Sequence, residues 1–318
     1  MMDLTPLRLF AMAALLALAI GARADQSDTG QGSVAAPFLT LPSDARSAAL
    51  AQAGVASTRD INAMSLNPAG LAGLSSQQVA VNQNFWLQGS SVESLSYGLG
   101  VFKHAGLGLD LNYFSVGAID RYAFDSNGQL QPNGSFNPYF FSAGLGYGQQ
   151  FGRNVSVGVL AKLVGQNIDG SAASALAVDL GAQYNLPIKG FSLGLAEQNL
   201  GSPLAGSDLP LLTRLGGSYF TGNPDRTSLT LDVDAQIPAA VVAQSSLSAG
   251  AELHYGRYLS FRGGYQLQQT SGLGGLTGLT AGAGFGQGNS HHAWEVDYAW
   301  VPMGELGHAN QISLLTKF

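Results

Sequence analysis

Residues 293–300 read AWEVDYAW, and their pattern decides the fold class. The large side chains Trp294, Val296, Tyr298 and Trp300 occupy one face, and Glu295, Asp297 and Ala299 occupy the other. A period of two is that of a β-strand, because successive side chains point to opposite faces of a sheet. The segment therefore predicts a strand with one apolar face and one largely polar face.

The same alternation recurs from residue 77 to the last residue, in segments separated by turn residues. We predict fourteen strands, at residues 77–88, 92–103, 106–116, 137–151, 154–167, 173–186, 190–199, 211–221, 226–237, 245–255, 257–268, 276–286, 291–301 and 309–318. Connections after the second, fourth, sixth, eighth, tenth and twelfth strands are short, and those after the third, fifth, seventh, ninth and thirteenth are longer. Short turns at one end and longer loops at the other are typical of an outer-membrane β-barrel, whose short turns face the periplasm.

A soluble β-sandwich or propeller also alternates, so the period alone leaves those folds open. Three further features favour the barrel. The strand length suits a tilted membrane crossing. Aromatic side chains gather at strand ends, as in the girdles of membrane barrels: Phe85, Trp86, Tyr113, Phe114, Tyr139, Phe140, Phe141, Tyr219, Phe220 and Trp300. The chain also ends on the strand-like NQISLLTKF (residues 310–318), and a closed barrel needs its last strand to pair with its first.

The composition argues against several classes of function. Only 11% of the residues are charged, the net charge is −6, and Cys is absent. The weak and distributed charge argues against nucleic acid as a partner. The lack of Cys excludes disulfides, thiolate metal sites and a Cys nucleophile. We expect no enzyme, cofactor or metal site, because the pairs Asp232/Asp234 and Glu295/Asp297 share a face through the pleat alone and His291-His292 lies at a predicted turn.

The N-terminus indicates export. Arg8 precedes the apolar run 9–20, and residues 22–24 match the A-x-A pattern of a cleavage site. The run is too short to span a bilayer as a helix. We expect four regions in a protein of the bacterial outer membrane: a signal peptide at residues 1–24, a flexible lead-in at 25–36, an N-terminal hatch at 37–75 and a transmembrane β-barrel at 76–318.

Three blocks resemble a known family. FLTLPSDARSAALAQAGVASTRDINAMSLNPAGLAGL (residues 38–74) resembles the N-terminal block of PorV/PorQ-type outer-membrane proteins. LPLLTRLGGSYF (209–220) and DYAWVPMGELGHANQISLLTKF (297–318) resemble that family's eighth strand and last hairpin. The resemblance implies an all-β, fourteen-stranded antiparallel barrel related to the FadL hydrocarbon transporters, with a short helical hatch in its lumen. It also implies that Phe318 belongs to the C-terminal signal read by the outer-membrane insertion machinery.

Physical reasoning also predicts a plug. Side chains alone fill the interior of a barrel of about eight strands, so fourteen strands enclose a lumen that they cannot fill. A charge-poor segment of small residues packs closely against such a wall. The turn Asn67-Pro68-Ala69-Gly70 is then expected inside the barrel, where it redirects the chain toward the first strand. The residues predicted for the hatch or gate are Arg46, Asp60, Asn62, Asn67, Pro68 and Gly70.

The strand faces opposite the apolar ones carry charges that we place in the lumen: Asp110, Lys162, Asp179, Arg214, Asp232, Asp234, Glu252, His254, Arg262, Glu295, Asp297 and Lys317. A charge facing lipid would cost roughly 2–4 kcal/mol at the bilayer midplane. We expect these groups to pair with one another and with Arg46, Arg59 and Asp60 of the hatch. Gly282, Gly284, Gly286 and Gly288 recur at every second position of one strand, which predicts that the hatch rests against it.

Three functions remain open. The resemblance favours an accessory of protein export, which holds or shuttles cargo at the outer membrane as in type IX secretion. Its partners would be a secretion translocon or exported cargo, contacted through exposed apolar loops such as SPLAGSDLPLL (202–212) or IPAAVVAQ (237–244). The second function is a FadL-like channel for hydrophobic small molecules, gated by the hatch, with an apolar pocket in which Phe38, Leu39, Leu41 and Leu71 face aromatic side chains. The third is a structural barrel that binds an envelope complex. All three place the protein among outer-membrane lipids.

Overall fold

The computed structural model describes residues 34–239, 245–256, 258–267, 276–288 and 292–318. Several predicted features lie outside the described residues: the signal peptide (1–24), most of the lead-in, His291 and the end of the loop IPAAVVAQ. Among the described residues, no helix has the length and apolar character needed to span a membrane.

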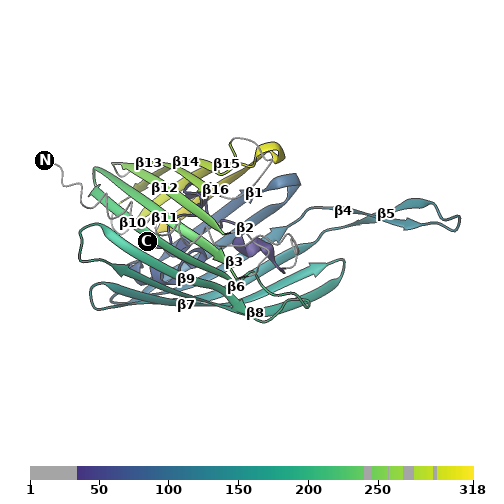
Figure 1. Cartoon of the computed structure of the whole chain (residues 1–318), viewed down its shortest axis with the longest axis horizontal. Coiled ribbons are helices and arrows are strands. Elements are labelled where there is room, and N and C mark those ends of the chain that lie inside the picture. Colours follow the sequence, from purple (N-terminus) through teal and green to yellow (C-terminus); the bar gives the residue numbers. More distant parts are fainter. Residues whose placement is uncertain (1–33, 240–244, 257, 268–275, 289–291) are drawn as a thin grey trace.

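The strands form a closed, antiparallel, fourteen-stranded barrel, which confirms the predicted fold class (Figure 1). The barrel strands are β1 (Gln78–Phe85), β2 (Ser91–Phe102), β3 (Ala105–Ser115), β6 (Tyr139–Phe151), β7 (Val155–Ile168), β8 (Ser171–Asn185), β9 (Phe191–Gly201), β10 (Leu212–Asn223), β11 (Thr227–Pro238), β12 (Ser246–Tyr255), β13 (Leu259–Leu267), β14 (Leu279–Gly288), β15 (Ala293–Pro302) and β16 (His308–Lys317). β1 pairs with β16 from Gln78↔Lys317 to Phe85↔Asn310, and Phe318 continues this seam by pairing with Gln77. This pairing closes the sheet, so no row of unpaired backbone groups faces lipid.

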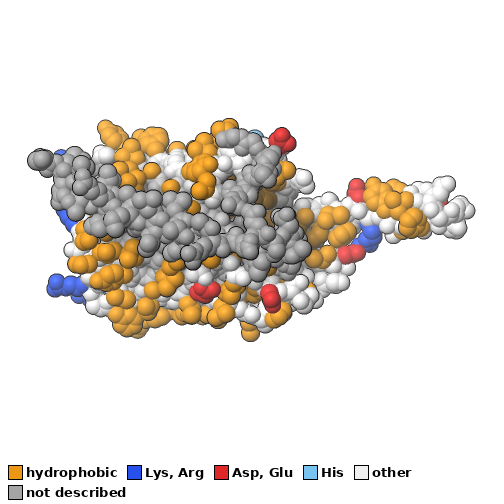
Figure 2. Space-filling model, viewed as in Figure 1, with side chains coloured by type: hydrophobic (Ala, Val, Ile, Leu, Met, Phe, Trp, Pro, Cys, Tyr) orange, Lys and Arg blue, Asp and Glu red, His pale blue; other side chains and the backbone are white. Residues whose placement is uncertain are grey.

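The wall is apolar outside and polar inside. On β15, Trp294, Val296 and Tyr298 are 38%, 40% and 45% exposed, whereas Asp297 is only 5% exposed. Figure 2 shows hydrophobic side chains over much of the visible outer wall. A soluble sandwich would bury its apolar face, so this exposure is the arrangement of a barrel whose outer face meets lipid.

Two connections differ from the prediction. Residues 116–138, expected to be a long loop, contain a separate hairpin of β4 (Ile119–Phe124) and β5 (Leu130–Phe136), which projects beyond the barrel (Figure 1). The connection after the fifth predicted strand, expected to be long, is the two-residue turn Asp169-Gly170 between β7 and β8. Both turn residues have positive φ, 53° and 82°, which suits a tight hairpin turn. Two further connections contain a short helical turn: η4 (Leu87–Gly89) lies between β1 and β2, and η5 (Gly304–Leu306) lies between β15 and β16.

Of the predicted hatch (37–75), residues 37–74 form short helical pieces within the barrel, and the name hatch refers to these residues from here on. The pieces are η1 (Pro37–Thr40), α2 (Ala45–Ala49), η2 (Ile61–Ser65) and η3 (Pro68–Gly73). η3 contacts β6, β7 and β8, whereas α2 contacts β13 to β16 across the lumen. Asp44, Asp60 and Asn67 each cap the piece that follows by accepting a hydrogen bond from a backbone N–H.

The only α-helix among the described residues of the hatch is short. α2 ends at Ala49, and Ala51 and Gln52 adopt left-handed backbone conformations. The Gln52 side chain accepts a hydrogen bond from Arg214 Nη2 at 2.9 Å. The backbone N–H groups of Gly54 and Val55 donate to Asp234 Oδ2 at 2.7 and 2.9 Å. Contacts with polar groups of the wall therefore replace the hydrogen bonds of further helical turns.

Candidate functional site

The interface between the hatch and the inner wall is the candidate functional site. Glycines on many strands face the hatch: Gly98, Gly100, Gly106, Gly108, Gly146, Gly148, Gly158, Gly181, Gly194, Gly216, Gly250, Gly264 and Gly282. A Cβ atom added to Gly148 would lie 2.7 Å from the Ala72 nitrogen, and one added to Gly250 would lie 3.0 Å from the Leu50 carbonyl oxygen. The backbone of the hatch thus lies almost against the backbone of the wall, as inward glycines permit.

Polar side chains of the wall satisfy backbone groups of the hatch. Ser313 Oγ accepts from the Ala45 N–H at 2.7 Å, and Thr280 Oγ1 donates to the Ala49 carbonyl at 2.8 Å. Gln78 Oε1 accepts from the Ile61 N–H at 3.0 Å, and Gln198 Nε2 donates to the Ser65 carbonyl at 2.8 Å. A mostly irregular segment can be buried in this way because the wall supplies the partners that a helix or sheet would otherwise provide.

Asn67, in the predicted turn at residues 67–70, joins η3 to β8 and to an earlier part of the hatch. Its fully buried side chain donates to the carbonyl oxygens of Val55 at 2.9 Å and Ala182 at 3.0 Å, while its Oδ1 accepts from the Ala69 N–H at 3.1 Å. These contacts fix the start of η3 to β8 and to the preceding hatch segment. The turn at residues 67–70 is therefore fixed by specific hydrogen bonds in addition to the φ restriction of Pro68.

Three more of the predicted hatch residues, Asn62, Pro68 and Gly70, have simpler contacts. A Cβ atom on Gly181 would lie 2.9 Å from Pro68 Cδ, so the proline ring packs on β8. A Cβ atom on Gly70 would lie 2.5 Å from Ala63 Cβ, which excludes a larger residue there. Asn62 donates its backbone N–H to the capping carboxylate of Asp60. These three positions shape the hatch and present no reactive group.

A cluster of charges ties α2 to the wall. Arg46 of the hatch forms a bidentate pair with Glu252 on β12, with Nε–Oε1 2.9 Å and Nη2–Oε2 2.7 Å. Glu252 also accepts from Arg262 Nε on β13 at 2.6 Å. Arg262 in turn contacts Glu295 at 2.8 Å and Asp297 on β15. Although burial alone would lower the pKa of Arg46, the adjacent Glu252 carboxylate holds it well above its usual value.

Four more of the predicted lumen charges, Asp110, Lys162, Asp179 and Asp232, lie on the inner face of the wall. Lys162 lies 2.8 Å from the Asp179 carboxylate on the neighbouring strand, and Asp110 accepts from Ser96 Oγ at 2.6 Å. Asp232 is buried beside Asp234 on β11. The contacts of Asp110, Lys162 and Asp179 stabilise the wall, whereas Asp234, Arg214 and Glu252 bind the hatch directly.

The glycines of β14 contact the hatch less than expected. Of the four predicted positions, only Gly282 lies against it, where an added Cβ would be 2.5 Å from Ala49 Cβ. Gly284 lies beside Arg262 and Asp297 instead, and Gly286 and Gly288 lie beside β15. Sequence reasoning missed the inward glycines of the other strands. Their signal was present in spacings of two, as in Gly106 and Gly108 or Gly146 and Gly148.

The end of the hatch near η1 lies in an aromatic cluster. The Phe38 ring lies 6.1 Å from that of Phe114 and 5.9 Å from that of Phe140. The loop SPLAGSDLPLL, expected to be exposed, covers this cluster, and its Leu204 and Leu209 are 0% and 5% exposed. The expectation was wrong for these leucines, which pack inward, whereas Pro203 and Ala205 of the loop are exposed. Leu71 belongs to another cluster with Ile61, Met64, Leu74, Ala80, Leu160 and Leu315.

The cavity beside the aromatic cluster of Phe38, Phe114 and Phe140 is small and partly polar. Its volume is about 50 Å³. Phe38, Leu39 and Leu41 line one side, and Asp110, Lys162, Asp179 and Gln198 are among the polar lining residues. An apolar cavity that accepts benzene measures on the order of 150 Å³. This cavity is too small and too polar for such a ligand.

Comparisons with known proteins agree with the geometry. The chain matches the family described as type IX secretion system protein PorV over residues 24–191. No individual curated protein matches it. Its fold is similar to that of the Pseudomonas putida toluene transporter TodX, with a TM-score of 0.57, 14% identity, and coverage of 86% of this chain and 96% of that one.

A Pseudomonas aeruginosa FadL homologue has a TM-score of 0.53 and 13% identity, with coverage of 86% of this chain and 98% of that chain. At such identities the likeness shows the fold alone. The family match, in contrast, spans more than half of the chain. With its fourteen-stranded barrel, the chain therefore belongs to the PorV family of outer-membrane β-barrel proteins.

Proposed function

We propose that this protein is a non-enzymatic accessory of protein export, which holds or shuttles exported cargo at the outer face of the outer membrane. The proposal rests on the match to the family whose description is type IX secretion system protein PorV. The partners it implies are a secretion translocon and exported cargo proteins. Outer-membrane lipid surrounds the barrel, and Phe318, at the seam with Gln77, would be read by the insertion machinery during assembly.

The projecting β4–β5 hairpin supports this function. Ile119, Tyr122, Phe124 and Leu130 are 40%, 54%, 75% and 57% exposed. The hairpin lies at the long-loop end, which faces the outside of the cell in barrels of this kind. Exposed apolar side chains with polar neighbours mark protein interaction surfaces. An isolated two-stranded sheet is only marginally stable, so a partner would also stabilise it.

A second candidate is transport of a hydrophobic small molecule. The likeness of the fold to toluene transporters and the cluster of Phe38, Phe114 and Phe140 favour it. The cavity beside that cluster measures about 50 Å³, so transport would require the hatch to move first. Protein export requires no such movement and is the better-supported function.

The experiment compares pulldowns from detergent-solubilised outer membranes with the full chain and with a variant carrying Ser at Ile119, Tyr122, Phe124 and Leu130. We expect the wild type to capture a translocon or cargo proteins, and the variant to lose them while still forming a folded barrel. A barrel with Asn127→Ala, at the hairpin tip, is the control and should capture the same proteins. Recovery of a monomer that carries only lipid or hydrocarbon would contradict export and favour transport.

A further inference from the structure

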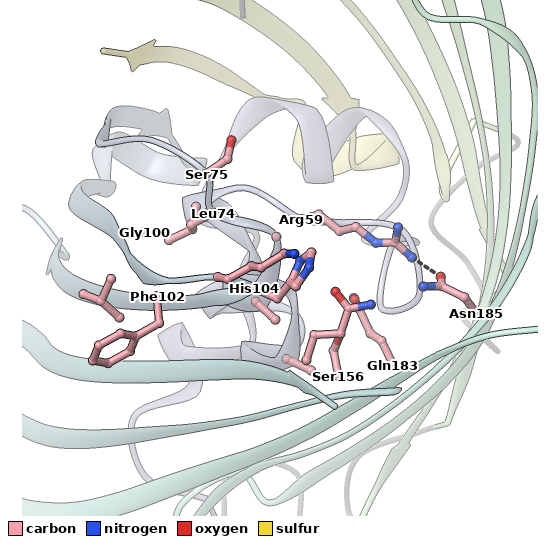
Figure 3. A pocket seen from close by; sticks show the side chains of 15 residues that line it. Arg59, Leu74, Ser75, Gly100, Phe102, His104, Ser156, Gln183 and Asn185 are labelled. Carbon is pink, nitrogen blue, oxygen red and sulfur yellow. Dashed lines mark hydrogen bonds between the residues drawn. The ribbon is translucent and has the colours of Figure 1, made fainter. Parts of the chain in front are cut away.

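A second cavity, of about 590 Å³, lies at the opposite end of the lumen from the aromatic cluster. Its lining combines the hatch, through Arg59 and Leu74, with the β2–β3 turn and with residues of β7 and β8. Figure 3 shows Arg59, His104 and Gln183 around this space, with the Arg59 guanidinium directed at Asn185. Because this end carries the short turns, the cavity faces the periplasm. We call it the periplasmic vestibule.

The ionisable residues that line the vestibule are basic. They are Arg59, Lys103 and His104, and the described lining includes no Asp or Glu. This contrasts with the charge cluster above, where Arg46 is neutralised by Glu252. The vestibule is large enough for a small organic ligand, since binding pockets typically measure about 300–1,000 Å³.

Arg59 differs from Arg46 in having neutral partners. Its guanidinium donates to Asn185 Oδ1 and, at 3.4 Å, to Ser192 Oγ. Among the described residues, no carboxylate forms an ion pair with it. Solvent reaches the side chain, yet the surrounding wall and hatch bury it enough to lower the pKa of Arg59. Because the described protein partners of this cation are neutral, an anion would give it a charge-assisted hydrogen bond, which is stronger than a bond to a neutral acceptor.

The backbone around Arg59 is fixed in place. Gln183 Nε2 donates to the carbonyl oxygens of Val55 and Thr58, both at 3.1 Å, which holds the chain just before Arg59 against β8. A Cβ atom on Gly73 would lie 2.9 Å from Arg59 Cβ, so the base of the side chain packs on η3. A preorganised guanidinium loses less entropy on binding than a free one.

The geometry points to a binding site for an organic oxyanion, a phosphate or carboxylate, in the periplasmic vestibule. Arg59 binds the oxyanion through its planar guanidinium. At the β2–β3 turn, Lys103 adds positive charge and His104 adds an imidazole N–H donor. Leu74 and the small side chains of Ala69 and Ala72 leave room for a slender apolar portion. This site is independent of the export function, which uses the opposite end of the barrel.

Binding to the full-length barrel in a neutral detergent tests the site. The probes are inorganic phosphate and short-chain phosphatidic acid, measured by calorimetry, with phosphatidylcholine as the zwitterionic comparison. We expect saturable binding of at least one anionic probe, weakened about tenfold or more by Arg59→Gln and less by Arg59→Lys, which keeps the charge without the bidentate geometry. Arg153→Gln, at an exposed arginine in the β6–β7 turn, should leave the affinity unchanged.

The double variant Lys103→Gln/His104→Gln provides a second test, because these turn residues lie outside the hatch. It should weaken binding even if Arg59→Gln disturbs the hatch. If inorganic phosphate binds without any lipid present and displaces phosphatidic acid, the site takes a soluble anion. If phosphatidic acid binds and inorganic phosphate does not, the site takes a lipid headgroup. The proposal would be overturned if neither anionic probe bound saturably. It would also be overturned if Arg59→Gln and Lys103→Gln/His104→Gln both bound the probe as tightly as the wild type.

Discussion

Glu252 joins the hatch to the wall through a single carboxylate. It is 1% exposed and contacts both Arg46 and Arg262 at distances of 2.6 to 2.9 Å. Removing one partner of a buried ionic group is costly because the remaining charge stays desolvated. Exposed pairs behave differently, since water screens each charge.

Glu252→Gln should therefore destabilise the protein by about 3 kcal/mol, because Arg46 loses its carboxylate partner while the side-chain volume is kept. Urea unfolding in detergent would measure the change. Asp169→Asn is the matched control: it removes the charge from an exposed pair with Arg121 and should cost no more than about 1 kcal/mol. Equal effects of the two substitutions would show that the Glu252 cluster does not hold the hatch.

Strand β13 shows how one element serves both the lipid and the hatch. Gly263 and Gly264 are adjacent and so face opposite sides of the wall. A Cβ atom on Gly264 would lie 2.7 Å from the backbone nitrogen of Ala51. The atom nearest to a Cβ on Gly263 would be the carbonyl oxygen of Thr280, at 3.9 Å. The alternation of the strand thus sets where side chains fit.

Gly264→Ala should destabilise the protein by about 1–3 kcal/mol, because the hatch backbone has to move away from the new methyl group. Gly263→Ala should have little effect, since its methyl group enters open space on the outer face. Thermal unfolding of the two variants in the same detergent makes the comparison. A larger loss for the outward position would contradict the described packing.

At the scale of the whole molecule, the hatch lies inside the lumen of the barrel. Fourteen strands leave a lumen that their own side chains do not fill. Helical pieces from residues 37–74 contact strands on opposite sides of that lumen. Conductance should therefore depend on the hatch and not on the β4–β5 hairpin, which is outside the barrel.

Deletion of residues 37–74 should convert a barrel of low conductance into an open pore, measured in planar lipid bilayers. A chain in which residues 119–136 are replaced by a short turn should conduct as little as the wild type. If the hatch deletion conducted no more than the full chain, another segment would have to block the lumen.

Much of the fold followed from the sequence because membrane strands obey simple rules. Alternation in AWEVDYAW places Trp294 outside and Asp297 inside, and lipid enforces that choice along every strand. The short connections at one end indicated the topology, and the strand-like end of the chain indicated closure. The β4–β5 hairpin was missed because its alternation is weak and its strands have no place in the wall.

The sequence by itself determined the number of strands in the barrel, the two faces of the wall and a small-residue segment suited to a plug, since these depend on local period and composition. Only the tertiary structure decided which residues meet inside the lumen. Arg46 and Glu252 are 206 positions apart, and Asn67 and Ala182 are 115 positions apart. The end of α2 at Ala49 and the neutral surroundings of Arg59 likewise depend on strands distant in sequence. Such contacts arise when the barrel closes around the hatch, because closure alone sets which side chains satisfy its buried polar groups.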